Sequence, residues 1–403
     1  MRLAPDSSNS RAGLAAVTRR SLLASFAGSA LLAGVPPQKE AILLKTPQGG
    51  LQPQAVVDSG GVIHLIYLYG DPAAADIGYV RKAPDEQDFS APIRVNDRPG
   101  SAIAIGSVRG AHIALGRSGR VHVAWNGSSK AEPKGPRDSI PMLYARIDDR
   151  GESFESQRNL MQTATGLDGG GSIAADPSGN IYVAWHAQGQ RDGKPIQGED
   201  NRRVWLARSS DDGRTFGRET AISPPGTGVC GCCGIGALAD NKGVLYLLYR
   251  SARAVIHRDM YLLISRDKGR VFDAVNLHPW QIGACPMSTS SLAQAGERVF
   301  LSWETSKQVY FAEVDTRTSS VGERIAAPGE SMNRKHPAIA ANRRGQILLC
   351  WTEGTGWRRG GSLHWQLFDP ARRPLAPTGE EAVVPVWGFG TAVAVRERFV
   401  VIC

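Results

Sequence analysis

One short turn motif recurs along this chain and constrains its fold more than any other feature. Ser209–Phe216 reads Ser-Ser-Asp-Asp-Gly-Arg-Thr-Phe, and Ser265–Phe272 matches it at Ser, Asp, Gly and the aromatic residue. Asp149–Phe154 keeps all but the serine, and the three phenylalanines lie 62 and 56 residues apart. A short Asp side chain can hydrogen-bond the backbone of its own turn, and Gly can take positive φ. The motif therefore predicts evenly spaced turns that join antiparallel strands.

A second repeat consists of five-residue apolar strands, most of which end in an aromatic residue. Its seven copies are Ile63–Tyr67, Val121–Trp125, Ile181–Trp185, Leu245–Tyr249, Val299–Trp303, Ile347–Trp351 and Phe399–Cys403. Each copy follows a strand of small residues and a turn, so each unit opens with a hairpin. Six of the hairpins continue into a third strand, at residues 77–81, 143–147, 204–208, 260–264, 309–313 and 363–367. A fourth strand is expected after the Asp-containing turn, which predicts units of four antiparallel strands.

Repeated units of this kind predict one all-β domain, a β-propeller of four-stranded blades, rather than the two or three domains that length alone suggests. The seventh hairpin has no third strand, while the lone N-terminal strand Ala41–Leu44 has no hairpin. If these two segments pair, they close the ring and leave no exposed sheet edge. Counting the units therefore gives seven blades.

The pattern Ser-x-Asp-x-Gly-x-x-Phe resembles the Asp box, or bacterial neuraminidase repeat, of sialidase-like β-propellers. The resemblance extends over roughly residues 40 to 403. It implies six blades, with the last hairpin as an addition, so six is the alternative to the count of seven. It also implies a carboxylate held by three arginines, a tyrosine nucleophile with a glutamate, and an aspartate acid/base. The family's Phe/Tyr-Arg-Ile-Pro motif is missing, so no catalytic residue is carried over on a motif.

Charge and composition narrow the classes of partner. The formal net charge of +9 falls to about +6 without residues 1–36, which carry four arginines and one aspartate. This balance suits an anionic partner such as an acidic glycan. The sequence has neither long Lys/Arg blocks nor basic residues interleaved with aromatics, so we expect no nucleic-acid partner. Nothing in the pattern demands self-association, and a monomer is expected.

The pattern of residues 1–36 predicts a targeting segment. Thr18-Arg19-Arg20-Ser21-Leu22-Leu23 looks like a twin-arginine signal, and an apolar run from Leu22 to Val35 follows it. That run is too short to span a bilayer. The sequence therefore predicts export by the twin-arginine pathway to the periplasm or beyond, with a single propeller domain at residues 37–403 and no membrane span after signal removal.

Propeller topology places two kinds of loop on one face of the domain. The loops before the first strand of each blade and those after the second strand meet there, opposite the Asp boxes. Two of these loops, 126–141 and 187–202, are long and polar, which is where binding residues tend to lie. The candidate catalytic and binding residues on this face are Arg109, Arg250, Arg258, Asp259, Glu304 and Arg334.

The cysteines form the sharpest local feature. Cys230, Cys232 and Cys233 lie in one stretch, Val229-Cys230-Gly231-Cys232-Cys233-Gly234, and Cys285 precedes the next blade at the equivalent position. Three interpretations remain open. Export favours a disulfide, for instance from Cys285 to one of the three. A thiolate metal site for copper or zinc, with His257 as a fourth ligand, is the second. A redox-active pair beside Arg250 and Arg258 is the third.

The remaining cysteines and the tryptophans are interpreted as structural residues. Cys350 and Cys403 fall in or at the end of apolar strands and are expected to be buried free thiols. The repeated tryptophans are expected to pack between blades rather than form a sugar-stacking platform.

Two functions of different classes follow from the sequence. The first is an exported propeller that binds, or binds and hydrolyses, an anionic glycan on its Arg/Cys-rich face. The second is a non-catalytic periplasmic propeller whose cysteine-rich loop holds a metal or a disulfide and whose face docks a partner protein. The glycosidase chemistry of sialidases requires no cysteine, so the cysteines favour the second hypothesis.

Overall fold

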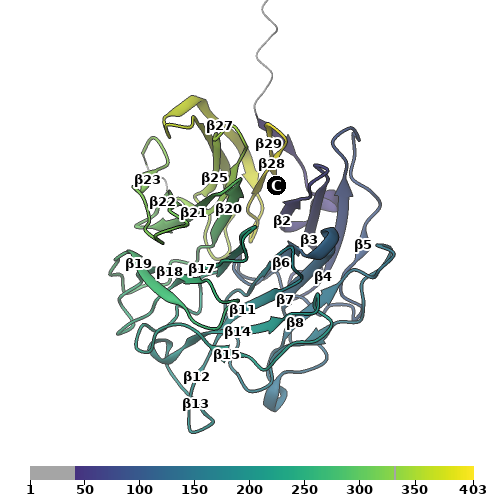
Figure 1. Cartoon of the computed structure of the whole chain (residues 1–403), viewed down its shortest axis with the longest axis vertical. Coiled ribbons are helices and arrows are strands. Elements are labelled where there is room, and N and C mark those ends of the chain that lie inside the picture. Colours follow the sequence, from purple (N-terminus) through teal and green to yellow (C-terminus); the bar gives the residue numbers. More distant parts are fainter. Residues whose placement is uncertain (1–40, 331–332) are drawn as a thin grey trace, which may run out of the picture. The chain divides into compact units, whose positions relative to one another are not determined.

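The computed structural model describes residues 41–330 and 333–403, and the predicted signal segment 1–36 lies outside these residues. Across the described ranges the chain forms a seven-bladed β-propeller, in which six sheets have four antiparallel strands and one has three (Figure 1). No helix in this part of the chain is long and apolar enough to cross a membrane. The count of seven blades is confirmed and the alternative of six is wrong.

Each blade is built from consecutive strands. The innermost strands are β2 (Leu51–Val57), β6 (Ala111–Leu115), β10 (Ser172–Ala175), β16 (Gly236–Ala239), β20 (Ser290–Ala295), β24 (Lys335–Ala341) and β28 (Thr391–Val395). The second strands are β3 (Ile63–Asp71), β7 (Val121–Asn126), β11 (Ile181–Ala187), β17 (Leu245–Arg250), β21 (Arg298–Thr305), β25 (Ile347–Glu353) and β29 (Arg398–Ile402). Neighbouring inner strands are in contact all the way round, from β2 through β28 and back to β2.

The outer strands complete six of the blades. The third strands are β4 (Ala74–Lys82), β8 (Met142–Arg146), β14 (Arg203–Ser209), β18 (Met260–Ser265), β22 (Gln308–Val314) and β26 (Gly361–Phe368). The fourth are β5 (Ile93–Arg94), β9 (Arg158–Asn159), β15 (Thr220–Ala221), β19 (Asp273–His278), β23 (Ile325–Ala326) and β27 (Pro374–Val384). The third blade also carries a projecting hairpin, β12 (Gly189–Arg191) and β13 (Lys194–Ile196), after its second strand.

The seventh blade joins the two ends of the described chain. Its hairpin β28–β29 pairs with β1 (Ala41–Leu44), and the register sets Ala41 opposite Phe399 and Leu44 opposite Ile402. Strand β1 runs parallel to β29, whereas the other pairings within blades are antiparallel. The predicted closure of the ring is therefore confirmed, and β1 covers the sheet edge that β29 would otherwise expose.

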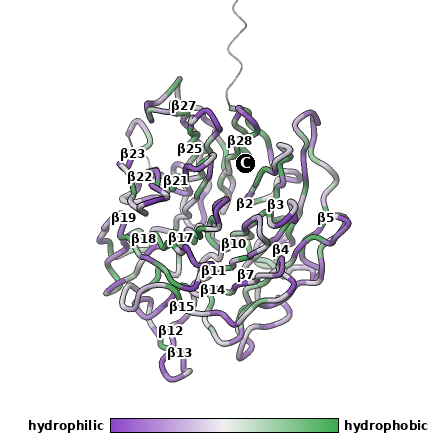
Figure 2. The backbone as a smooth tube through the Cα atoms, viewed as in Figure 1, coloured by the Kyte–Doolittle hydropathy of each residue, from purple (hydrophilic) through white to green (hydrophobic). Residues whose placement is uncertain are grey.

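The core lies between blades rather than at one centre. Seven apolar clusters each join side chains of two successive blades, the last one joining the seventh blade to the first. Trp125, Trp185, Trp303 and Trp351 at the ends of second strands are at most 1% exposed. They pack between blades, as predicted, and truncating any one of them to alanine would cost about 3–5 kcal/mol. In Figure 2 the projecting hairpin β12–β13 is largely hydrophilic, which fits its place outside these clusters.

The Asp boxes join third and fourth strands, as their pattern predicts. In the first copy Ser209 Oγ donates to Asp211 Oδ1 (2.6 Å), and Asp211 Oδ1 accepts from the Thr215 N–H (2.9 Å). Gly213 takes a φ of 74°, a conformation that favours glycine. Phe216 packs edge-on against Tyr144 with ring centroids 4.8 Å apart and is half-buried. These turns fix one face of the ring, and the candidate site lies on the other.

Candidate functional site

The candidate site lies where the loops of the third, fourth and fifth blades meet. Cys230, Cys232 and Cys233 precede β16, and Cys285 precedes β20, so both segments reach the face opposite the Asp boxes. The end of β17 and the residues before β18 contribute further side chains from the fourth blade. A one-turn 3₁₀ helix, η4 (Glu199–Asn201), reaches the same place from the third blade.

Two cysteine sulfurs are in direct contact at this place. Cys230 Sγ and Cys232 Sγ lie 3.4 Å apart, well beyond the roughly 2.05 Å of a disulfide bond. The thiol of Cys285 also interacts with both of them, and the thiol of Cys233 interacts with Cys230 and Cys232. Cys230 and Cys233 are buried, Cys232 is half-buried and Cys285 is exposed. The four sulfurs therefore form one cluster with an open side.

Backbone contacts hold the cysteine loop in shape. The Cys230 N–H donates to the Arg250 carbonyl (2.9 Å), and the Cys233 N–H donates to the Cys230 carbonyl (3.3 Å). His186 Nε2 donates to the Cys233 carbonyl (2.8 Å), and burial lowers the pKa of this histidine to about 4, so it is neutral at pH 7. Gly231 passes close to Asp168, since a Cβ there would lie 2.8 Å from its Oδ2. Glycine leaves room for this close approach.

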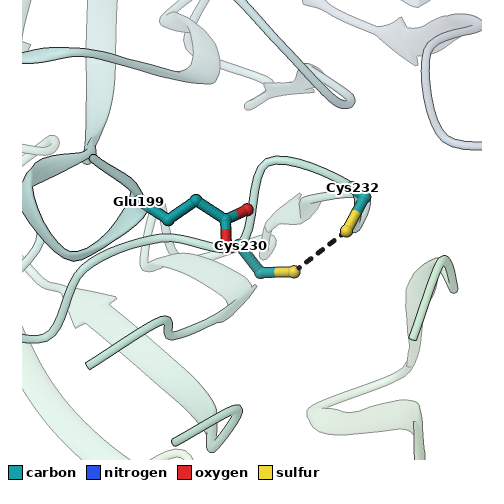
Figure 3. A group of neighbouring side chains, drawn as sticks. All are labelled: Glu199, Cys230 and Cys232. Carbon is teal, nitrogen blue, oxygen red and sulfur yellow. Dashed lines mark hydrogen bonds between the residues drawn. The ribbon is translucent and has the colours of Figure 1, made fainter. Parts of the chain in front are cut away.

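A carboxylate completes the cluster of donor atoms. Side-chain ligand atoms of Glu199, Cys230 and Cys232 all lie within 4.8 Å of one another. Figure 3 shows the Cys230 and Cys232 sulfurs facing each other, with the Glu199 side chain beside Cys230. Glu199 Oε1 also accepts from the Gly231 N–H (3.1 Å). Glu199 is therefore the further residue whose ligand atom lies near both sulfurs. Among the described residues, no contact of the His257 imidazole with these cysteines is observed.

Two buried arginines border the sulfurs. Arg258 Nη2 lies 2.6 Å from Glu199 Oε2, and Arg250 Nη2 lies 3.3 Å from Glu304 Oε2. Arg250, Arg258 and Glu304 are each at most 3% exposed. Arg258 Nε, Arg258 Nη1 and Arg250 Nε have no hydrogen-bond partner in the described structure. Buried N–H groups without a partner are costly, so these two guanidiniums carry unused donor capacity beside the thiols.

Contacts between the thiols, with a smaller contribution from the arginines, favour the thiolate forms of Cys233 and Cys285. Hydrogen bonding from the Cys230 thiol, with a contribution from Arg258, lowers the pKa of Cys285 to about 6. Burial would raise the pKa of Cys233, but hydrogen bonds from Cys230 and Cys232 and the charge of Arg250 lower it overall. The pKa of Cys230 is raised, chiefly by its contact with Cys232, because the cluster shares its protons. Thiolate is the form that binds metals and acts as a nucleophile.

The other candidate residues are spread around the face, each with its own partner. Arg109 Nη2 pairs with Asp168 Oδ1 at 2.7 Å, and Arg334 Nε pairs with Glu353 Oε1 at 2.8 Å. Asp259 accepts from the Trp280 N–H (2.9 Å) and from an amide of the fourth blade. The four candidate arginines therefore do not converge into one carboxylate clamp, because each is paired with a different acidic side chain.

A small cavity opens beside Cys232. It has a volume of about 30 Å³ and is lined by Arg109, Cys232, Met287, Lys335, Trp357 and Trp387, among others. Sequence reasoning did not single out Glu199, Met287 or Lys335. Glu199 falls in the long polar loop 187–202, which was the only signal for it, and nothing in the sequence marks the other two.

Comparisons with known proteins bear on the fold. No protein-family model matches the chain, and no curated protein sequence matches it. Solved structures do match: the Hadza microbial sialidase Hz136 is 13% identical with a TM-score of 0.50, over 81% of this chain and 70% of that one. The K499G mutant of NanB sialidase from Streptococcus pneumoniae is 11% identical with a TM-score of 0.52, over 76% and 65%. The Aleuria aurantia lectin AAL is 13% identical with a TM-score of 0.50, over 83% and 96%.

These matches show the fold of the chain. The chain has a sialidase-like β-propeller fold, as the Asp boxes predicted, and it shares this architecture with glycan hydrolases and a lectin. Identities this low show the fold alone, and one fold hosts many functions.

Proposed function

We propose that this chain is an exported propeller that binds a thiophilic metal ion, Cu(I) in preference to Zn(II), through the cysteines of its loop face. The observation that carries the proposal is the 3.4 Å contact of Cys230 and Cys232, with a Glu199 oxygen within 4.8 Å and Cys285 interacting with both sulfurs. Clustered thiolates select Cu(I), Zn(II) or iron–sulfur clusters.

Two features favour Cu(I) over Zn(II). The thioether of Met287 lines the cavity that adjoins Cys232, and thioethers are ligands of Cu(I). Arg250 and Arg258 place positive charge beside the sulfurs, as their effects on the Cys233 and Cys285 thiols indicate. A monovalent ion is repelled less by these charges than a divalent one.

The proposal is tested by metal analysis and thiol counting on protein exported by its own signal. We expect about one copper ion per chain and protection of several thiols from alkylation until the metal is chelated. If the protein instead carries no metal and two thiols appear only after reduction, the cluster is a disulfide and the metal proposal fails. Cys403, which is half-buried and lies 3.5 Å from Lys45 Nζ, provides an internal reference thiol.

Binding of an anionic glycan is the second candidate, and one observation favours it. Trp357 is 44% exposed and lies with Arg109 at the cavity on the loop face, where an indole and a guanidinium suit a charged sugar. The fold shared with sialidases and a lectin supports glycan binding. The ion pairs of the candidate arginines argue against it, because each guanidinium already binds a carboxylate of the chain. Binding of sialylated but not neutral oligosaccharides, lost in Trp357→Ala, would establish this function. Equal binding of sialylated and neutral oligosaccharides would exclude this function.

Export through the twin-arginine pathway belongs to the same proposal, because the pathway delivers folded proteins. Replacing Arg19 and Arg20 together by lysine is expected to leave the precursor in the cytoplasm. Unchanged delivery would show that an ordinary secretory route is used. A cell-fractionation blot distinguishes the two.

A further inference from the structure

A buried lysine without a partner lies in the wall of the cavity beside Cys232. Lys335 begins β24 in the sixth blade and is only 9% exposed. Its ammonium makes no hydrogen bond or ion pair among the described residues, although its own carbonyl accepts from Thr352. Removing an ammonium from water without a counter-charge is costly. The cavity therefore offers a positive charge that nothing in the described chain neutralises directly.

The nearby acidic group is already engaged elsewhere. Glu304 attracts Lys335, but its carboxylate is paired with Arg250 and accepts from the Lys307 N–H (2.8 Å). The other cation of the cavity, Arg109, is neutralised by Asp168 at 2.7 Å. Lys335 is thus attracted by Glu304 and by the Cys233 and Cys232 thiols, but its ammonium is in direct contact with no anionic group of the described chain.

The remaining wall is mostly apolar and polarisable, and its polar side chains Ser107, His336 and Thr355 already have hydrogen-bond partners. The indoles of Trp357 and Trp387, the thioether of Met287 and the thiol of Cys232 line the space. Trp387 Nε1 donates to the Trp357 carbonyl (2.6 Å), which ties the two tryptophan segments together. A Cβ on Gly106 would lie 2.8 Å from the Trp357 ring, so glycine there lets the indole close the wall. Such walls offer few hydrogen bonds, and an ion that holds its water weakly loses least on entering.

We propose that this cavity binds a small, weakly hydrated, singly charged anion in contact with the Lys335 ammonium. Its volume of about 30 Å³ is far below the roughly 300 Å³ of ordinary ligand pockets, so a sugar ring does not fit inside. A glycan could contact only the rim of this cavity, where Trp357 is exposed, whereas the anion would lie inside it. Cys232 and Met287 line this cavity as well, so metal-free protein is needed to separate the anion site from the proposed metal site.

The test uses thiocyanate as the probe on reduced, metal-free protein, with sulfate at matched ionic strength as the comparison ion. Equilibrium dialysis is expected to show one saturable thiocyanate site and no comparable sulfate site. Lys335→Met is expected to weaken thiocyanate binding at least tenfold. Lys242→Met is the matched control, because Lys242 is an exposed lysine paired with Glu297 on the opposite face. Non-saturable uptake, or equal affinity in Lys335→Met and the wild type, would overturn the proposal.

A second measurement keeps the proposal testable if Lys335→Met does not fold. Thiocyanate binding is expected to change indole emission with the dissociation constant found by dialysis. Trp357→Phe and Trp387→Phe, which leave Lys335 in place, should each remove a large part of that change. If neither variant alters the response, the anion binds elsewhere and the proposal fails. Because no metal is present in either experiment, failure here leaves the metal proposal untouched.

Discussion

Both faces of this propeller hold arginines with little solvent exposure, half-buried Arg120 on the Asp-box face and buried Arg258 on the loop face, but they use them differently. On the Asp-box face Arg120 places Nε 2.7 Å from Asp212, Nη1 on the Ile147 carbonyl (2.7 Å) and Nη2 on Asp149. On the loop face Arg258 makes one ion pair with Glu199 and leaves Nε and Nη1 without a partner. Buried polar groups are normally satisfied within the fold. For these two arginines, the difference indicates that Arg120 serves stability and that Arg258 is directed at something that binds.

The largest effect is expected from Asp212, the centre of the Asp-box network. Asp212 is 4% exposed and contacts Arg120, Arg146 and His122. Asp212→Ala should lower the free energy of unfolding by about 3 kcal/mol, because the buried Arg146 and the half-buried Arg120 lose a shared carboxylate and keep only Glu155 and Asp149. Urea denaturation at pH 7 measures this, with copper binding unchanged.

Asp149→Ala is the matched control for Asp212→Ala. Asp149 contacts the same arginine but its side chain is 75% exposed, so its loss should cost at most about 1 kcal/mol. Equal losses for the two variants would remove the distinction between buried and exposed partners. A loss of copper binding in Asp212→Ala would show that the two faces do not have separate roles in stability and binding.

A substitution in the thiol cluster is expected to weaken metal binding and to leave the stability of the fold nearly unchanged. Cys232→Ser removes one of the two sulfurs that touch and should weaken Cu(I) binding by more than about 100-fold, since even outer partners of metal ligands matter 10- to 100-fold. The free energy of unfolding should change little, because Cys232 is only half-buried. Competition with a Cu(I) chelator measures the affinity. Cys403→Ser, the same substitution on a distant thiol, should bind copper like the wild type.

Acid should weaken the Asp-box network within a defined pH range. Burial would raise the pKa of Asp212, but hydrogen bonds with His122 and Arg120 lower it to about 2, below the ordinary value of 3.8. The stabilisation is therefore complete above pH 4 and disappears as the pH falls through about 2. The difference in unfolding free energy between the wild type and Asp212→Asn should shrink by about 2 kcal/mol over that range. A difference independent of pH would show that the charge of Asp212 does not matter.

The smallest effect concerns the choice of metal. Arg258→Gln removes one positive charge beside the sulfurs, and this should shift the ratio of Zn(II) to Cu(I) affinity about tenfold toward zinc, because a divalent ion gains more. A purely structural role of Arg258 would lower both affinities together. Arg258→Lys, which keeps the charge, should restore the original ratio. Arg120→Gln on the other face is the control that leaves the ratio unchanged.

Local sequence patterns were sufficient for the fold because propeller contacts are mostly between neighbouring strands. Each of the seven apolar copies, from the first at Ile63–Tyr67 to the last at Phe399–Cys403, forms the second strand of a blade. The turn at Ser209–Phe216 joins a third and a fourth strand, as its Asp and Gly predict. The meeting of β1 with the last hairpin also followed from counting. Its parallel direction did not, because pairing direction depends on how the two ends approach.

By itself, the sequence determined the repeat, a count of seven units with six blades as the alternative, two end segments able to close the ring, and the grouping of three cysteines in one loop. Only the tertiary structure decided that Glu199 rather than His257 joins Cys230 and Cys232, that each candidate arginine takes a separate carboxylate, and that Lys335 faces a cavity. The physical reason is distance along the chain. Strand periodicity and turn chemistry act over a few residues, whereas these contacts join loops of different blades whose side-chain directions are set by the packing of the whole ring.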